Sequence, residues 1–195
     1  EFIDWSPFFR SWQLFGKFPD ILTDNVVGEQ ATILFNEAKA MLKKILQEKS
    51  FKAKGIFGIF PGNATERDDI LVYDDNQNVI STFRTLRQQH KKSEGKEYFA
   101  LSDFIAPENS AKQDYIGVFC VCTGFGADEL AKEYEDKMDD YNAIMVKALA
   151  DRFAEAFAEY LHKKVRTEYW GYSENETLTN DDLIKEKYLG IRPAP

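Results

Sequence analysis

Tyr115-Ile-Gly-Val-Phe-Cys-Val-Cys122 has the clearest strand pattern in this 195-residue chain, and Thr123-Gly-Phe-Gly126 follows it directly. β-Branched and aromatic residues dominate the first segment, which is typical of a strand. Gly124 and Gly126 then break the chain. Because the rest of a dinucleotide-binding fingerprint is absent, we interpret them as a strand-to-helix turn. From Ala127 to about Tyr169 apolar residues recur at helical spacing, with a bend expected near residues 138–141.

Other segments add helices and strands around this unit. A helix is expected from about Glu29 to Lys49, and a shorter one between Pro7 and Pro19 in an aromatic N-terminal stretch that we expect to pack as an arm. Segments 70–73 and 79–83 predict a hairpin. Further expected elements are a strand over Gly55–Phe60 stopped by Pro61, a short strand over Tyr98–Leu101, and a last helix from Thr179 to Gly190. The apolar stripe of the helix over 29–49 comprises Ile33, Leu34, Ala38, Met41, Leu42, Ile45 and Leu46. This mixture indicates an α+β fold.

Composition excludes several classes of protein. Lys and Arg number 25 and Asp and Glu 33, which gives a formal net charge of −8. Phosphate binding needs clustered Lys and Arg, so no nucleic acid partner is expected. The longest strand-like apolar run, Ile116 to Cys122, has seven residues, far below what a membrane span requires. Residues 1–5 show no secretory leader, and we therefore expect a cytoplasmic domain without membrane contact.

The residue types that usually carry chemistry are scarce. Only two histidines and two cysteines are present, too few for a structural zinc site of the usual Cys and His ligands. Cys120 and Cys122 are predicted to be buried core thiols, poorly placed for a disulfide. His162 is predicted to act as a cation near a helix end, and His90 to be solvated. No catalytic motif is present, so the residues alone indicate no catalytic machinery.

Two charged blocks and the C-terminal tail stand out. Residues 84–96 carry a net charge of +4 and residues 128–140 a net charge of −5. Each block is either a solvated face or a surface that steers partners of opposite sign, and both interpretations stay open. In Ile191-Arg-Pro-Ala-Pro195 the backbone is extended, and the planar fork of Arg192 suits a carboxylate, although Pro-rich ends are usually linkers.

Several long motifs, in register along the whole chain, resemble those of one family. They are Phe2-Ile-Asp-Trp5 with Pro7-Phe-Phe9, Asp114-Tyr-Ile-Gly-Val-Phe119, Asp139-Asp-Tyr-Asn-Ala-Ile-Met-Val-Lys-Ala-Leu-Ala-Asp-Arg152, Ala154-Glu-Ala-Phe-Ala-Glu-Tyr-Leu-His162, Tyr169-Trp-Gly-Tyr172 and Gly190-Ile-Arg-Pro-Ala-Pro195. The chain resembles the C-terminal activation (reactivation) domain of cobalamin-dependent methionine synthase. The resemblance implies a single C-shaped domain with a curved, mostly antiparallel sheet flanked by long helices.

The function implied by the resemblance is cofactor repair in a cytoplasmic methyltransferase of methionine biosynthesis. Such a domain binds S-adenosylmethionine (AdoMet) and presents it to the cobalamin-binding module of the same enzyme when that cofactor has become inactive cob(II)alamin. An electron from flavodoxin or from methionine synthase reductase drives the methyl transfer. Cobalamin and zinc belong to other modules, and the isolated fragment is not expected to be catalytic.

The resemblance also implies binding residues. Asp4 matches the aspartate that holds the AdoMet amino group as a charge-assisted acceptor. Arg192 matches the arginine that pairs with the methionyl carboxylate, and the backbone of Pro193 and Ala194 lines the adenosyl part. No residue is implied to be catalytic and none to bind a metal.

Glu155 and Glu186 match acidic positions near that site and are expected to favour the sulfonium charge. The alternative is that both are ordinary surface charges of helices.

The chain departs from the family pattern at its end. The family motif R-x-x-x-G-Y begins at Arg192, and the sequence stops at Pro195 before its Gly-Tyr. We therefore expect residues 1–195 to form an activation domain that lacks its C-terminal part, with an incomplete ligand site. The alternative function is an interaction module that docks flavodoxin or a reductase through residues 84–96 without binding a ligand.

Overall fold

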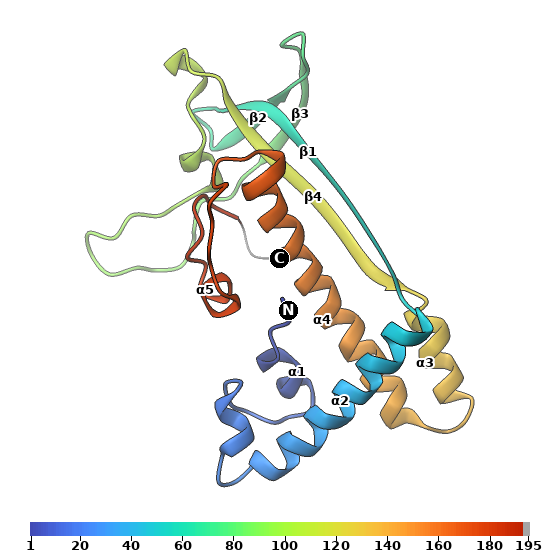
Figure 1. Cartoon of the computed structure of the whole chain (residues 1–195). Coiled ribbons are helices and arrows are strands. Elements are labelled where there is room, and N and C mark those ends of the chain that lie inside the picture. Colours follow the sequence, from blue (N-terminus) through green and yellow to red (C-terminus); the bar gives the residue numbers. More distant parts are fainter. Residues whose placement is uncertain (193–195) are drawn as a thin grey trace. The chain divides into compact units, whose positions relative to one another are not determined.

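The computed structural model describes residues 1–192, which divide into two compact units. Unit 1 comprises residues 1–56 and 120–188, and unit 2 comprises residues 57–119 and 189–192. The helices are α1 (Ser6–Ser11), α2 (Gly28–Glu48), α3 (Ala127–Glu135), α4 (Asp140–Lys164) and α5 (Asn180–Ile184), with a π-helical turn over Val165–Tyr169 and 3₁₀ turns over Asp20–Thr23, Leu101–Phe104 and Glu108–Ser110 (Figure 1). The strands are β1 (Lys52–Ala64), β2 (Asp69–Tyr73), β3 (Val79–Arg84) and β4 (Asp114–Phe125).

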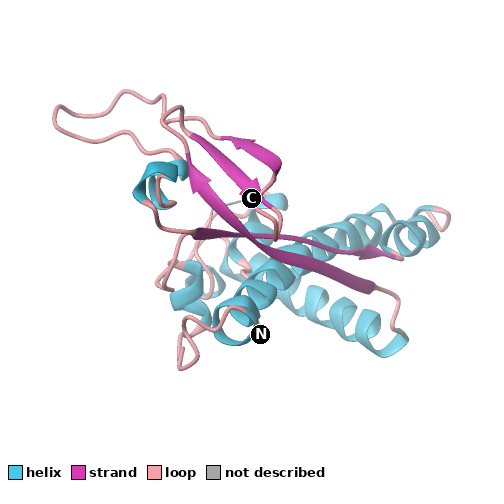
Figure 2. Ribbon diagram, turned by 90° about the horizontal axis from the view of Figure 1, so that it is seen from above, coloured by secondary structure: helices cyan, strands magenta, loops and turns pink. Residues whose placement is uncertain are grey.

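Unit 2 contains a β-hairpin and the long connection that follows it (Figure 2). β2 pairs antiparallel with β3, which confirms the hairpin predicted over 70–73 and 79–83. On its other side β2 pairs antiparallel with the end of β1, where Gly62–Ala64 lie opposite Ile70–Val72. The strand order is β3-β2-β1-β4, and the residues of β1 and β4 are divided between the two units. The predicted combination of helices with one open, mostly antiparallel sheet is confirmed.

Unit 1 is built around the packing of α2, α3 and α4. The break between α3 and α4 lies where the sequence predicts a bend, because Met138 has a φ of 57°. Asp139 then caps α4, since its carboxylate accepts a hydrogen bond of 3.1 Å from the backbone N–H of Asn142. The buried residues that these three helices contribute to the core are Ala31, Leu34, Ala38, Met41, Ile45, Leu130, Ala131, Ala143, Met145, Val146 and Leu149.

The aromatic N-terminal stretch packs onto this helical core, as predicted. Phe8 and Phe9 of α1 are buried, and the Trp5 ring meets the Phe35 ring of α2 edge to face with 5.0 Å between centroids. Aromatic pairs of this geometry are worth more than their buried area alone. This packing holds the first turn of the chain, and with it Asp4, against α2.

Three predicted secondary-structure elements differ from the structure: two have wrong boundaries and one is not formed. β1 continues through Pro61, because proline removes one donor without preventing extended backbone, and the pairing with β2 begins one residue later. Tyr98–Leu101 is not a strand: a 3₁₀ turn begins at Leu101, and the Asp103 carboxylate accepts a hydrogen bond from Ala100 N at 2.9 Å. The last helix ends at Ile184 instead of Gly190, since Glu186 is already left-handed at φ 53°.

Two burial predictions are also wrong. Ile33 and Leu46 are 53% and 62% exposed, so the buried stripe of α2 is narrower than the sequence suggests. Cys120 and Cys122 are exposed. Side chains alternate between the two faces of a strand, and Thr123 is buried with its hydroxyl donating to Ala150 O of α4 at 3.1 Å. The two cysteines therefore lie on the face of β4 directed away from α4. No helix within residues 1–192 is long and apolar enough to cross a membrane.

The strand-to-helix turn at Gly126 permits a testable prediction. Gly126 has a φ of +93°, and a Cβ there would lie 2.1 Å from the carbonyl oxygen of Ser50. Gly126→Ala combines a backbone conformation unfavourable to L-residues with a clash against backbone, so the free energy of unfolding should fall by about 2 kcal/mol or more. Urea denaturation measures this change.

Gly124→Ala is the matched control two residues earlier. A Cβ at Gly124 meets nothing within 4 Å. Its free energy of unfolding should change by less than about 1 kcal/mol. Equal losses in the two variants would contradict the assigned role of Gly126.

Candidate ligand site

The residues proposed from the sequence to bind a ligand are distributed over both units. Asp4, Glu155 and Glu186 belong to unit 1, and Arg192 belongs to unit 2. Pro193 and Ala194 lie outside the described residues. The three carboxylates of unit 1 have different environments, and only that of Asp4 combines partial burial with an oxygen that has no donor among residues 1–192.

Asp4 is part-buried at the start of α1 and has one engaged oxygen. Its Oδ1 accepts a hydrogen bond of 2.9 Å from the backbone N–H of Ser6. Within residues 1–192 no donor contacts Oδ2 of this carboxylate. Asp4 therefore has a fixed orientation and an oxygen available to a ligand.

The backbone around Asp4 is held from several sides within unit 1. The Phe2 ring meets Tyr160 of α4 edge to face at 5.6 Å, and Lys163 Nζ lies 5.7 Å from the centre of the Phe2 ring. The side-chain amide of Asn180 in α5 donates to the carbonyl of Ile3 at 3.4 Å. Asp4 thus lies where the N-terminal segment meets α4 and α5.

Glu155 is already paired. Both its oxygens accept from Arg152, with Nη1 at 2.5 Å and Nη2 at 2.7 Å. Arg152 is only 7% exposed, so the fork-shaped pair mainly neutralises a buried cation of α4. Glu186 lies in the exposed turn after α5. Among residues 1–192, no hydrogen bond or ion pair joins either glutamate to Asp4.

A buried polar cluster that the sequence did not reveal lies at the end of α4. Arg166, in the π-helical turn, is fully buried and forms a two-pronged ion pair with Glu176 at 2.7 Å from Nε and 2.6 Å from Nη2. The guanidinium also lies 4.5 Å from the centre of the Tyr188 ring. In the sequence, the i, i+4 spacing of His162 and Arg166 is the one sign that two members of this cluster are neighbours. Glu176 and Tyr188 follow in segments without helical periodicity, so the sequence does not place them near Arg166.

His162 is part of this cluster and does not serve as the predicted cationic cap. It is 7% exposed, and its Nδ1 lies 2.6 Å from Nη1 of Arg166. Arginine has donors only, so Nδ1 is the acceptor in this contact. His162 thus lies buried against a cation, and the prediction that it acts as a cap at the helix end is wrong.

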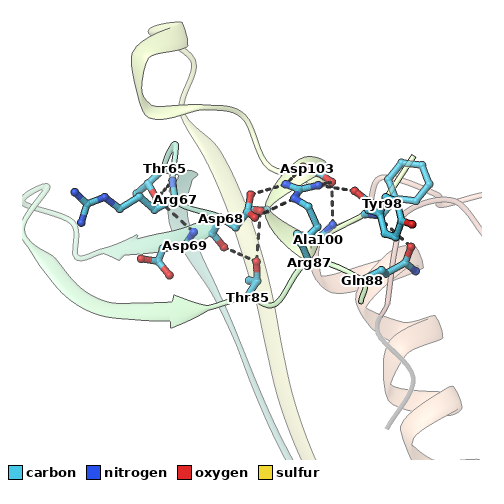
Figure 3. A network of polar contacts seen from close by, with 12 residues as sticks. Thr65, Arg67, Asp68, Asp69, Thr85, Arg87, Gln88, Tyr98, Ala100 and Asp103 are labelled. Atoms are coloured by element: carbon cyan, nitrogen blue, oxygen red, sulfur yellow. Dashed lines mark hydrogen bonds and ion pairs between the residues drawn. The ribbon is translucent and has the colours of Figure 1, made fainter. Parts of the chain in front are cut away.

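The basic block over residues 84–96 is largely neutralised within unit 2. Arg87 donates to Asp103 at 2.7 and 2.8 Å and also pairs with Asp68 (Figure 3). Arg84 pairs with Asp69. These three carboxylates reduce the block's net charge from +4 to +1. The block consequently ties a loop to the hairpin instead of presenting a strong positive field.

Hydrogen bonding from Arg87 is the main reason that the pKa of Asp103 falls to about 2, with the Ala100 N–H adding to it. The hydrogen bonds of Arg87 to Asp103, first, and to Asp68 raise the pKa of Arg87. Within residues 1–192 no group of three or more His, Cys, Asp or Glu side chains could hold a metal ion.

Comparison with solved structures defines the class of protein. The chain matches the structure titled "Crystal Structure of the MetH Reactivation Domain bound to AdoHcy" with a TM-score of 0.92 and 53% sequence identity. The fold is therefore that of a reactivation domain. The match covers 100% of this chain and 60% of that one, so this chain spans about 60% of the length of the structure it matches.

The family follows from the sequence. Residues 1–195 match the family described as "Vitamin B12 dependent methionine synthase, activation domain". The chain belongs to this family, which confirms the resemblance drawn from the motifs.

The buried ion pair leads to a prediction about stability. Glu176→Gln removes the charge that balances Arg166, whose side chain is 0% exposed, while the Glu176 side chain is 3% exposed. An uncompensated buried cation should lower the free energy of unfolding by about 3–5 kcal/mol. Glu168→Gln, which breaks the exposed pair with Lys164, should cost less than about 1 kcal/mol. Thermal and urea denaturation of both variants test this difference, and similar losses would contradict it.

The loop contact of Asp103 leads to a prediction about acid stability. Its pKa is lowered from 3.8 to about 2 in the folded chain, so its stabilising effect is full above about pH 4 and is lost as the pH falls towards 2. Asp103→Asn should therefore lose less stability between pH 4 and pH 2 than the unmodified chain. Asp75→Asn, at an exposed turn, should leave that slope unchanged. Denaturation series at several pH values provide the measurement.

Proposed function

We propose that this domain binds AdoMet and presents it for the reductive remethylation of inactive cob(II)alamin in a cobalamin-dependent methionine synthase. The observation that carries the proposal is the match of the whole chain, at 53% identity, to a reactivation domain bound to AdoHcy. AdoHcy is what remains of AdoMet after its methyl group has been transferred. A site for one therefore has the groups that recognise the amino acid and adenosyl parts of the other.

The residues of unit 1 fit an amino-acid ligand at Asp4. A carboxylate oriented by Ser6 N–H, with its second oxygen free of donors among residues 1–192, suits an ammonium group. Arg192 is proposed to pair with the ligand carboxylate, and the backbone of Pro193 and Ala194 to line the adenosyl part. Glu155 and Glu186 are proposed only as sources of negative potential for the sulfonium. Glu155 would share its carboxylate with Arg152.

When bound, AdoMet would supply its sulfonium methyl group, which is transferred to cobalamin after the cobalamin has received one electron. The role of this chain is to bind and orient the methyl donor. We propose that the cobalamin-binding module of the same enzyme is its docking partner and that flavodoxin or methionine synthase reductase supplies the electron. The isolated residues 1–195 are proposed not to catalyse the transfer. They are also proposed to form an activation domain whose site includes residues beyond Pro195.

The ion pairs of unit 2 argue against the alternative of a docking module that uses residues 84–96. Its two arginines are already paired with Asp68, Asp69 and Asp103. Such docking relies on an open positive field, and the remaining net charge of +1 supplies little of one.

Charge removal at Asp4 tests the proposal. Asp4→Asn keeps an oxygen for Ser6 N–H but loses the anion, so the affinity for AdoHcy in the full-length protein should fall about 10- to 100-fold. Arg192→Ala should produce a loss of similar size. Isothermal titration calorimetry measures both.

Asp20→Asn, at an exposed position in a 3₁₀ turn, is the matched control and should leave the affinity unchanged. Unaltered binding in both Asp4→Asn and Arg192→Ala would reject these residues as ligand contacts.

A further inference from the structure

The two polar atoms of the Asn180 side-chain amide differ in their hydrogen bonding. It is the first residue of α5, and Nδ2 lies 3.4 Å from the carbonyl oxygen of Ile3. The opposite end, Oδ1, is buried and accepts no hydrogen bond from any residue between 1 and 192. Buried polar atoms of proteins are nearly always hydrogen-bonded, so an acceptor of this kind calls for an explanation.

The orientation of this amide is determined by its neighbour. A carbonyl oxygen can only accept, so the end of the Asn180 side chain that faces Ile3 O must be the NH₂ group. The alternative orientation would bring two acceptors together and leave two donors buried without partners. Oδ1 is therefore directed away from Ile3 O as an acceptor that lacks a donor.

Asn180 is also close to the backbone of Asp4. The Ile3 carbonyl belongs to the peptide group that joins Ile3 to Asp4, and in a planar trans peptide its oxygen is roughly 3 Å from the Cα of Asp4. The Asn180 amide nitrogen thus lies within about 6 Å of that Cα. Both residues belong to unit 1, so the juxtaposition lies within one compact unit.

The two acceptors complement each other chemically. An ammonium group has several N–H donors, and a single carboxylate oxygen uses only one of them. Among residues 1–192, neither the anionic Oδ2 of Asp4 nor the neutral Oδ1 of Asn180 accepts a hydrogen bond.

We propose that Asn180 is a second binding residue for the α-amino group of the ligand and, through Ile3, a positioning residue for Asp4. The inference rests on the proposed function and deepens it, because it assigns selectivity for the amino group to a residue that the family motifs do not include. Recognition by buried polar groups discriminates strongly against analogues that lack the partner, since those groups are then left unpaired.

The experiment compares two ligands that differ only at this group. AdoHcy and its deamino analogue, in which the α-amino group is replaced by hydrogen, are titrated calorimetrically into the full-length protein. Asn180→Leu removes the acceptor with little change in volume. Its affinity for AdoHcy should fall about 10- to 100-fold, while its affinity for the deamino analogue should change less than about twofold.

Controls separate recognition from folding. Asn175→Leu, at an exposed position in the same segment, should leave both affinities unchanged. Asn180→Ser, which places a smaller side chain there, should show the same selective loss if Asn180→Leu does not fold. Equal losses for the two ligands in the variants would show a structural role only and overturn the inference. Unchanged binding of AdoHcy would show that water satisfies Oδ1 and would also overturn it.

The experiment also distinguishes failure of the proposed function from failure of this inference. An unmodified protein that does not bind AdoHcy at all would reject both the proposed function and this inference. Binding by the unmodified protein, with no selective effect at Asn180, would reject the inference alone.

Discussion

The buried pair of Arg166 and Glu176 is the constraint on which the packing of the segment after α4 depends. A guanidinium with no solvent contact is tolerated only when its charge and donors are satisfied, and here Glu176, His162 and the Tyr188 ring surround it. These partners come from α4 and from the segment after it. The pair therefore holds residues 176 and 188 against the end of α4, and α5 lies between them in the chain. Because burying the two charges costs desolvation free energy, the ion pair contributes little net stability, and its main effect is to position these segments.

Asp4 depends on this arrangement indirectly. Asn180, which contacts the peptide group before Asp4, follows Glu176 by four residues, and Thr179 caps α5 by accepting from Asp182 N. On the other side, aromatic packing of Trp5 on Phe35 fixes the first turn of the chain to α2. A carboxylate held between two anchored segments keeps its orientation without a ligand, and such preorganisation reduces the entropic cost of binding.

In unit 2, ion pairs neutralise much of the positive charge that the sequence concentrates in residues 84–96. Residues 84–96 form a basic block in the sequence, yet Arg84 at the end of β3 pairs with Asp69, the first residue of β2, and Arg87 pairs with Asp68 just before it. The ion pairs of Arg87 with Asp68 and Asp103 hold a loop against the hairpin (Figure 3). A count of charges along the chain does not include partners that the fold brings from elsewhere.

The sequence by itself determined the elements and the family. The helix over 28–48, the hairpin, the long strand 114–125 with its glycine exit and the break before α4 all follow from local periodicity and turn chemistry, which act over a few residues. Asp4 and Arg192 followed from motifs in register. Only the tertiary structure decided the exposure of Cys120 and Cys122 and the buried contacts of His162, Arg166 and Asn180. Each of these depends on a partner or a sheet face set by packing between distant segments, for which no local pattern exists.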